Sequence, residues 1–362
     1  MPIKIFSFFA GLGFLDLGFE NAGFNISFVN EKNSTFLSSY KYARRNRNYS
    51  PVYGYSDNDI RDYLSSNKWN ATFQDYNNRN GYLIGFIGGP PCPDFSVAGK
   101  NKGQDGKNGI LTSVYFEIIK LYKPDFFLFE NVKGLYRTKK HRSFYEDEKS
   151  KLREAGYILF DSIENSLEYG VPQYRDRLFL VGFLKSKFGE KVKFNMGSHK
   201  KYILEDVLTL DWPKTNPFFV DMPMMCPKHI QEELTVEYWF KKNMVDLHKN
   251  SRDFFGIKSI DKYLKTYEGD ISGKSFKRLH RWRYSPTAAY GNNEVHLHPY
   301  KLRRISVAEA LAIQSAPADF EIPDKISLSA KFRMVSNGVP VLLAQGIAKD
   351  ILDTVKDYAG GV

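Results

Sequence analysis

A cysteine lies at the tip of a turn that is rich in glycine and proline. The turn follows the apolar run 82–87, which we expect to be a buried strand, and reads Gly88-Gly89-Pro90-Pro91-Cys92-Pro93. Because proline rings fix the backbone, the turn is stiff and holds the thiol at the end of the strand. A thiolate is a strong nucleophile, so Cys92 is our candidate for covalent catalysis. The alternative is a buried, inert cysteine.

Two glycines follow the first apolar run and precede a helical pattern. The segment reads Phe9-Ala10-Gly11-Leu12-Gly13, and the second apolar run ends in Asn30-Glu31. Glycine lets the backbone approach a ligand closely, and a helix N-terminus offers free N–H groups to an anion. An acid at the end of the second strand holds ribose hydroxyls in nucleotide-binding α/β folds. Together these features indicate an adenosine-containing cofactor; the alternative is a tight turn without a ligand.

Charged side chains flank two further apolar runs. Glu130 directly follows the run 126–129, so its carboxyl group is partly desolvated and we expect a pKa high enough for proton donation. Arg175 and Arg177 precede the run 178–183 and share one face of an extended segment. Guanidinium groups in this arrangement suit carbonyl or phosphate oxygens. The alternatives are a helix-capping or surface acid and a pair of surface arginines in ion pairs.

The first half of the chain alternates apolar runs with amphipathic segments. We expect strands over 3–8, 26–29, 82–87, 126–129 and 178–183, and helices over 15–22, 112–121 and 144–155. Strands that alternate with helices predict an α/β fold, with a mostly parallel sheet and helices on both faces. Ligands bind beyond the carboxyl ends of the strands in such sheets, and the cysteine, the glycines and the acids all lie there.

The alternation stops near residue 190. Residues 191–300 show no clear period and look like a separate, smaller domain. From Ser306 a helix is expected, because a serine cap is followed by Glu309 at the third helical position, as in a capping box. A second helix is expected over 341–355.

The composition narrows the class of protein. The chain has 362 residues, a formal net charge of +11 and two cysteines, which give neither a disulfide framework nor zinc-ligand spacing. A reducing, cytoplasmic compartment fits, and no apolar run approaches membrane-spanning length. A basic chain suits a polyanionic partner. Basic residues are densest over 274–304, interleaved with aromatic and amide groups that suit phosphates and base edges; the alternative is a solvated basic surface.

The order of these motifs resembles the DNA cytosine-5 methyltransferase family of bacterial restriction-modification type. The order is Phe-x-Gly-x-Gly, Glu31, Pro-Pro-Cys, Glu-Asn-Val, Gln-x-Arg-x-Arg, a basic variable region and Asn337-Gly338-Val339-Pro340. The resemblance covers residues 3 to about 185 and 296–355. It implies a Rossmann-like fold dependent on S-adenosyl-L-methionine, with a catalytic domain of 1–190 and 301–362 and a target recognition domain of 191–300. The substrate would be a cytosine flipped out of double-stranded DNA.

The resemblance also implies a role for individual residues. Cys92 would attack C6 of cytosine, and Glu130 would hydrogen-bond N3 and the exocyclic amine. Arg177 would hold O2, with Arg175 near it or near a phosphate. The residues expected to bind the cofactor are Phe9, Gly11, Leu12, Gly13, Glu31, Asp59, Ile60, Pro91, Leu111 and Asn337. Those expected to contact DNA are Lys100, Lys102, Arg278, Arg281, Arg283, Thr287, Asn292 and Asn293.

Four positions depart from the pattern of the family. Pro93 stands where many relatives have Gln, and Ala98 replaces a common Ser. Phe14 occupies a position that is often Gly, and Gly338 replaces a common Ser. None of these changes removes a group that the chemistry requires.

The resemblance implies a bacterial, cytoplasmic protein at the nucleoid. We expect a monomer without metal or membrane contact, and a cognate restriction endonuclease in the same system. One alternative is a tRNA cytosine-5 methyltransferase on the same fold, although its Cys-Phe-Thr signature is absent from the sequence. Another is a catalytically inactive DNA-binding regulator, against which the intact Cys92, Glu130, Arg175 and Arg177 argue. A nicotinamide-dependent dehydrogenase has a different glycine spacing.

Overall fold

The computed structural model describes most of the chain. The described residues are 2–47, 50–74, 76, 81–91, 107–257, 259–273, 276–288, 290 and 296–360.

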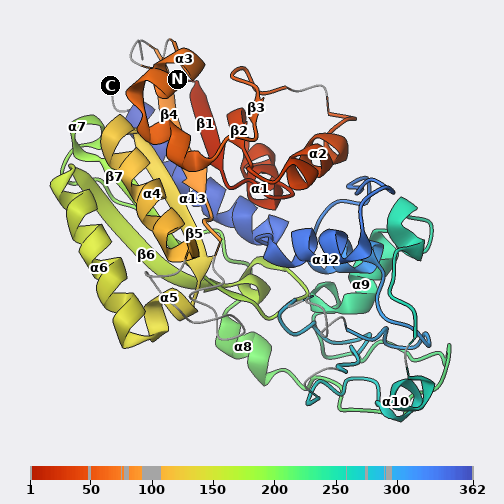
Figure 1. Ribbon diagram of the computed structural model, residues 1–362. Helices are drawn as coiled ribbons and strands as arrows, with labels where there is room; N and C mark the ends of the chain where they lie inside the picture. Colours follow the sequence, from red (N-terminus) through yellow and green to blue (C-terminus); the bar gives the residue numbers. More distant parts are fainter. Residues whose placement is uncertain are drawn as a thin grey trace.

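The core of the fold is a seven-stranded sheet in the order β3-β2-β1-β4-β5-β7-β6 (Figure 1). Its strands are β1 (Ile3–Phe8), β2 (Asn25–Asn30), β3 (Tyr55–Ser56), β4 (Leu83–Gly88), β5 (Phe126–Val132), β6 (Tyr157–Asn165) and β7 (Asp176–Leu184). The pairs from β3 to β5 are parallel, whereas β7 runs antiparallel to both β5 and β6. The sheet is therefore mostly parallel, as predicted.

All five predicted strands are present, but two others were not predicted. The short β3 has only two residues, and β6 lies at the sheet edge, where several of its side chains are half-buried or exposed. In β6 the apolar run 157–160 is followed by Asp161 and Ser162, so the strand does not show the continuous apolar pattern of a buried parallel strand over its length.

Helices cover both faces of the sheet (Figure 1). They are α1 (Phe14–Ala22), α2 (Ser34–Ala43), η1 (Ile60–Leu64), α3 (Ser66–Thr72), α4 (Lys107–Tyr122), α5 (Gly134–Arg137), α6 (Lys139–Glu154), η3 (Ser166–Tyr169), α7 (Lys185–Phe188), α8 (Leu204–Thr209), η4 (Glu232–Leu234), α9 (Val236–Lys242), η5 (Lys249–Arg252), α10 (Ile260–Lys265), α11 (Val307–Ile313), α12 (Leu328–Asn337) and α13 (Val341–Gly360). The capping box that was predicted at the start of α11 is confirmed, with Ser306 and Glu309 bonding each other's backbone N–H.

Side chains of each central strand alternate between two apolar layers. In β5, Phe126 and Leu128 pack with α1 and α13, whereas Phe127 and Phe129 pack with α3, α4 and α6. This period of two follows from strand geometry. Burial on both faces fixes the register, so the carboxyl ends of β1, β2, β4 and β5 stay aligned at one edge.

Residues 191–300 add no strand to this sheet. Residues of α9 pack with Leu12, Phe14 and Leu17 and with α11, in a third apolar cluster. Part of this segment therefore shares its core with both ends of the chain. The division into 1–190 with 301–362 and 191–300 stays a prediction, and this packing couples the two parts at α9 and α11.

The C-terminal helix packs directly against the first helix. A Cβ on Gly18 of α1 would lie 2.4 Å from the Cβ of Ala344 and 2.6 Å from the backbone N of Gln345. Glycine is required here for close approach, because the contacted atoms include backbone. The close packing of α1 and α13 also fixes the start of α13, and therefore the end of the segment 338–340 that leads into it.

A buried polar cluster supports the turn between β1 and α1. Asp16 accepts hydrogen bonds from the hydroxyls of Ser7 (2.7 Å) and Tyr40 (2.8 Å). The Arg44 guanidinium donates to the carbonyl oxygens of Leu12 and Gly13 and stacks on the Tyr40 ring. The turn is therefore held from its buried side by a cation that donates hydrogen bonds to two of its carbonyl oxygens.

We expect Gly18→Ala to destabilise the protein. Alanine favours helix by roughly 1 kcal/mol, but the overlap with Ala344 and Gln345 should outweigh this gain at about 1–3 kcal/mol. Urea unfolding measures the change. Gly256→Ala is the matched control because nothing lies within 4 Å of its added Cβ, and equal stability of the two variants would contradict the packing argument.

Asp16 predicts a particular pH dependence of stability. Burial raises its pKa from 3.8 to about 6, although Arg44 opposes the shift. A raised pKa stabilises the fold below pH 4, and this contribution is lost as pH rises through about 6. The loss amounts to roughly 3 kcal/mol. Asp16→Asn cannot ionise, so its unfolding free energy should fall less than the wild-type value between pH 4 and 6.5; parallel curves would contradict the assignment.

Candidate active site

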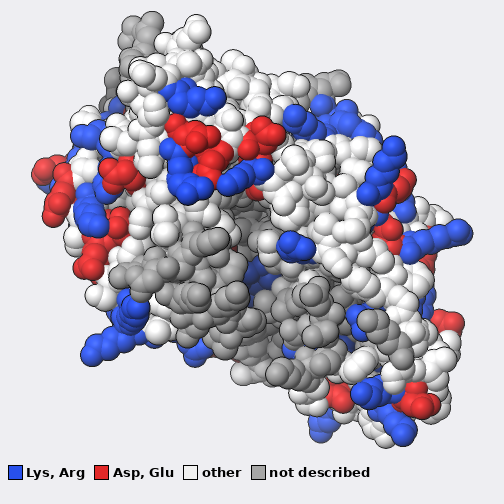
Figure 2. Space-filling view, in the orientation of Figure 1, with Lys and Arg blue, Asp and Glu red and all other residues white. Residues whose placement is uncertain are grey.

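A cavity of about 1360 Å³ lies at the carboxyl edge of the parallel strands. Figure 2 shows the hollow near the centre of one face, with Lys and Arg side chains in and beside it. A typical pocket for one small ligand has about 300–1,000 Å³. The volume therefore suits more than one bound group, for example a cofactor and a second substrate.

The turn after β1 forms one wall of the cavity. Phe9 (φ 55°), Gly11 (φ 57°) and Gly13 (φ 87°) all adopt left-handed backbone conformations. Left-handed φ is strained for phenylalanine, and such strain concentrates at functional sites. Both Phe9 and Leu12 line the cavity with the two glycines.

Glu31 lies beside this turn, at the end of β2. Its carboxylate accepts hydrogen bonds from the backbone N–H of Gly11 and of Asn33, each at 2.8 Å. Burial raises its pKa, while the two backbone donors oppose the rise. Each carboxylate oxygen keeps a second lone pair, so Glu31 can still accept bonds from a diol.

Asp59 and Ile60 close the cavity beyond β3. Asp59 caps η1 and pairs with Arg61 (2.7 Å) and Lys32 (2.6 Å). These two cations lower the pKa of Asp59, so it is ionised throughout the neutral range. Ile60 is buried, and its contact with the cavity is apolar.

Glu130 and Arg177 form an ion pair inside the cavity. Glu130 ends the apolar part of β5 and Arg177 lies opposite Val132 on β7, which brings Oε1 of Glu130 to 3.0 Å from Nε of Arg177. Burial raises the pKa of Glu130 above its ordinary value, although Arg177 and Arg175 oppose the shift. This is the raised pKa predicted from the sequence.

The glycine-proline turn meets this ion pair. A Cβ on Gly89 would lie 2.7 Å from Oε2 of Glu130, so the turn passes in close contact with the carboxylate. Pro90 and Pro91 line the same cavity, as do Leu111 and Asn337. Motifs from four distant parts of the sequence therefore face one space. Cys92 itself lies outside the described residues.

Arg175 lines the same cavity as Glu130 and Arg177, where it was expected near the base. Its guanidinium donates to the carbonyl oxygens of Ala288 (3.1 Å), Ser336 (2.6 Å) and Gly338 (3.1 Å), and the residue is 1% exposed. These bonds position the walls of the cavity. A contact of Arg175 with a base or a phosphate stays a prediction.

Arg278 also lies inside the protein. Its guanidinium donates to the carbonyl oxygens of Thr266, His298 and Tyr263 and stacks on the Phe218 ring at 3.5 Å. It is fully buried, and burial lowers its pKa to about 10. We therefore do not retain Arg278 among the residues that contact bases.

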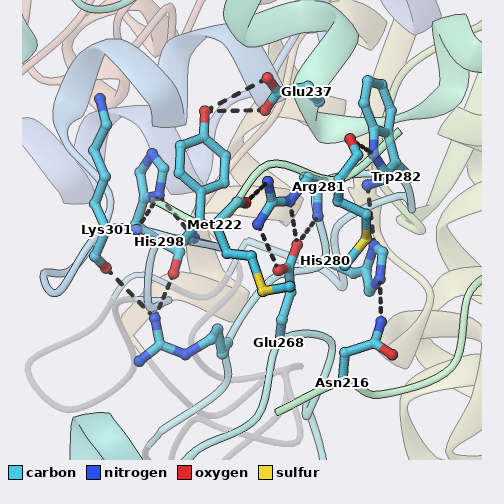
Figure 3. A network of polar contacts seen from close by, with 12 residues as sticks. Asn216, Met222, Glu237, Glu268, His280, Arg281, Trp282, His298 and Lys301 are labelled. Atoms are coloured by element: carbon cyan, nitrogen blue, oxygen red, sulfur yellow. Dashed lines mark hydrogen bonds and ion pairs between the residues drawn. The ribbon is translucent and has the colours of Figure 1, made fainter. Parts of the chain in front are cut away.

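Arg281 supports a loop of the same region (Figure 3). It makes a bidentate ion pair with Glu268 at 2.9 Å and donates to the carbonyl oxygen of Met222 at 2.7 Å. Neighbouring Trp282 donates to the carbonyl oxygen of Met224. Arg281 is 5% exposed, so the expectation of a base contact is corrected for this residue too.

The remaining predicted DNA contacts fall into two groups. Arg283 is half-buried with its guanidinium near the Tyr284 ring, and Thr287 is exposed and lines the cavity. The other four, Lys100, Lys102, Asn292 and Asn293, lie outside the described residues.

Sequence analysis missed several residues of the cavity, among them Arg333 and Tyr290. Arg333 on α12 is exposed and lines the cavity, and no side-chain partner is found for it among the described residues. Tyr290 also lines the cavity, although it is 3% exposed. Arg333 lies four residues before Asn337 and therefore on the same face of α12, but no helix was predicted over these residues.

The described residues show neither a metal site nor a membrane-spanning helix. No group of three or more His, Cys, Asp or Glu side chains is placed to hold a metal ion. None of the described helices is long and apolar enough to cross a membrane.

Comparisons with known proteins agree with this geometry. The family model for C-5 cytosine-specific DNA methylase matches residues 3–353. Type II methyltransferase M.NmeDI of Neisseria meningitidis serogroup C is 51% identical over 358 residues, covering 98% of this chain and 83% of that protein. Type II methyltransferase M.FnuDI of Fusobacterium nucleatum is 30% identical, with coverage of 98% and 96%.

A solved structure shares the fold. The S. pombe Dnmt2 methyltransferase has a TM-score of 0.61 at 14% identity, over 97% of this chain and 99% of that one. With the strands, the cavity and its motifs in the arrangement described above, and with the family match spanning nearly the whole sequence, the chain belongs to the C-5 cytosine-specific DNA methylase family.

Proposed function

We propose that this protein is a sequence-specific DNA methyltransferase that forms a covalent bond between Cys92 and a flipped-out cytosine. The observation that carries the proposal is the buried Glu130–Arg177 ion pair in contact with the turn that leads to Cys92. A carboxyl group and a guanidinium on one side of a base match the polar edge of cytosine, and Cys92 directly follows this turn in the sequence.

The cavity fits S-adenosyl-L-methionine, the methyl donor of this family. Phe9 offers an aromatic face for adenine, Glu31 offers acceptors for the ribose hydroxyls, and Asp59 with Ile60 lies at the adenine edge. Gly11, Gly13 and Asn337 line the remaining length, with Leu12, Pro91 and Leu111 as apolar neighbours. When bound, the cofactor supplies an electrophilic methyl group.

The protein's own residues activate the base. The Cys92 thiolate bonds to C6, and the electron pair of the 5,6 double bond moves to C5, which becomes nucleophilic. Glu130 hydrogen-bonds N3 and the exocyclic amine, where charge develops, and burial raises the pKa of its carboxyl group. Arg177 holds O2. After C5 gains its methyl group, a base removes the C5 proton and the electron pair expels Cys92.

The buried position of Glu130 also determines how the DNA must bind. A cytosine inside a stacked duplex cannot reach the Glu130 carboxyl group, so the base must leave the helix. We propose that residues 191–300 recognise the target sequence, with Arg283 and Thr287 as the described candidates, and that Lys100, Lys102, Asn292 and Asn293 contact DNA beside them. Recognition would then depend on side chains that the buried Arg278 and Arg281 hold in place.

The relatives suggest the biological setting. Because the matched relatives are named Type II methyltransferases, we propose that the protein modifies DNA for a restriction-modification system with a cognate endonuclease. We further propose a monomer in the bacterial cytoplasm, at the nucleoid.

The first test is bisulfite sequencing of a plasmid library treated with purified protein and S-adenosyl-L-methionine. We expect protected cytosines within one short motif for the wild type, and none for Cys92→Ala, because alanine cannot bond to C6. Cys92→Ala should still bind the same DNA. Cys226→Ala is the matched control and should methylate normally. Turnover by Cys92→Ala would contradict the covalent route, and methylation of tRNA without methylation of DNA would contradict the substrate.

Arg333→Gln should weaken DNA binding. Arg333 is an exposed cation at the cavity, so we expect it to neutralise one DNA phosphate. The slope of log K against log salt should then become less steep by about 0.9. Cofactor affinity should not change.

Lys185→Gln is the control for this measurement. Lys185 lies on α7, which follows the antiparallel β7 and is therefore at the opposite edge of the sheet from the cavity. An unchanged slope in Arg333→Gln, or a loss of cofactor affinity in its place, would show that Arg333 does not bind phosphate.

A further inference from the structure

Phe14 and Gly338 are in unusually close contact at the wall of the cavity. A Cβ on Gly338 would lie 2.2 Å from Cδ2 and 3.0 Å from Cε2 of the Phe14 ring. Both residues line the cavity. Two of the four departures from the family pattern therefore touch each other.

The backbone of Gly338 does not require glycine. Its φ of −70° and ψ of 153° are extended values that any residue adopts. The absence of a side chain at position 338 is therefore explained by space alone, and the Phe14 ring fills that space.

The Phe14 ring has little freedom to move away. It is 1% exposed, lies at the first position of α1 and packs at 5.3 Å from the Phe320 ring. Its apolar cluster includes residues of α9, α11 and α12. A side chain at position 338 would have to displace its own backbone, because the ring is enclosed by close-packed groups.

The segment around Gly338 carries Asn337 to the cavity. Arg175 donates to the carbonyl oxygens of Ser336 and Gly338, on either side of Asn337 in the sequence. The backbone of this segment is therefore fixed by the Arg175 guanidinium and by contact with the Phe14 ring. Asn337 is exposed and lines the cavity. In the sequence it lies between Ser336 and Gly338, the two residues whose carbonyl oxygens Arg175 binds.

We propose that Phe14 and Gly338 form a coupled pair that positions Asn337 for the cofactor. The inference rests on the proposed cofactor site and assigns two positioning residues to it. Either residue depends on the other: a side chain at 338 is tolerated only when the ring at 14 is absent, and removal of the ring alone leaves a gap beside the Asn337 segment.

A double-mutant cycle tests the pair, with cofactor affinity measured by calorimetry on purified protein without DNA. Gly338→Ser should weaken binding of S-adenosyl-L-methionine by at least about tenfold, because the segment must shift. Phe14→Gly should also weaken it. The double variant Phe14→Gly/Gly338→Ser should bind within about threefold of the wild type, since the serine then has room.

Two further measurements separate positioning from general damage. Gly256→Ser, where the added atoms meet open space, should bind the cofactor normally. Affinity of Gly338→Ser for duplex DNA should stay within about twofold of the wild type, because the segment's phosphate contact through Arg333 lies a full helical turn away. If Gly338→Ser does not accumulate as folded protein, accumulation of the double variant Phe14→Gly/Gly338→Ser as folded protein, compared with each single variant, measures the same coupling.

The outcomes distinguish this inference from the proposed function. No cofactor binding by the wild type would overturn the proposed function itself. Normal binding by the wild type with additive effects of the two substitutions would overturn the coupled pair and leave the function intact. Weakened DNA binding equal to the weakened cofactor binding in Gly338→Ser would show a general structural defect and overturn the positioning role.

Discussion

The cavity depends on one buried guanidinium. Arg175 precedes β7, yet its three carbonyl partners belong to segments more than 110 positions later in the chain. A buried cation is costly to desolvate, and this cost is offset only while all the carbonyl groups remain in place. The position of the segment around Ala288 and that of the segment around Asn337 are therefore fixed by the same group.

Several arginines of the basic segment 274–304 stabilise the protein's own loops through hydrogen bonds and ion pairs. Arg278, Arg281 and Arg303 are held by protein carbonyls or by the carboxylates of Glu268 and Glu309. Such ionic contacts fix loop geometry where regular secondary structure is sparse. The positive charge that remains available to DNA is thus smaller than the composition of this segment indicates.

Much of the fold was predictable because buried parallel strands leave a strong pattern. The runs that became β1, β2, β4, β5 and β7 are mostly apolar, with only Lys4, Ser7 and Ser27 as polar interruptions, and the candidate site residues follow four of these runs directly. The strand β6 was not predicted because polar residues such as the exposed Asp161 and the half-buried Ser162 interrupt its sequence at the sheet edge.

The candidate site was predictable only in part. Glu31, Glu130 and the glycine turn could be placed, since a strand end locates them at one edge of the sheet. The burial of Arg278 and Arg281 could not, because backbone carbonyl partners leave no trace in the sequence. The amino-acid composition of a lysine- and arginine-rich segment is the same whether its cations face solvent or the protein interior.

The contact between Phe14 and Gly338 also constrains how this sequence could have arisen. A phenylalanine at 14 facing a serine at 338 would place two groups in one volume, whereas a glycine at both positions leaves only a gap. The contact therefore makes the order of substitutions matter. A side chain at 338 can be introduced without overlap only after the ring at 14 has been removed.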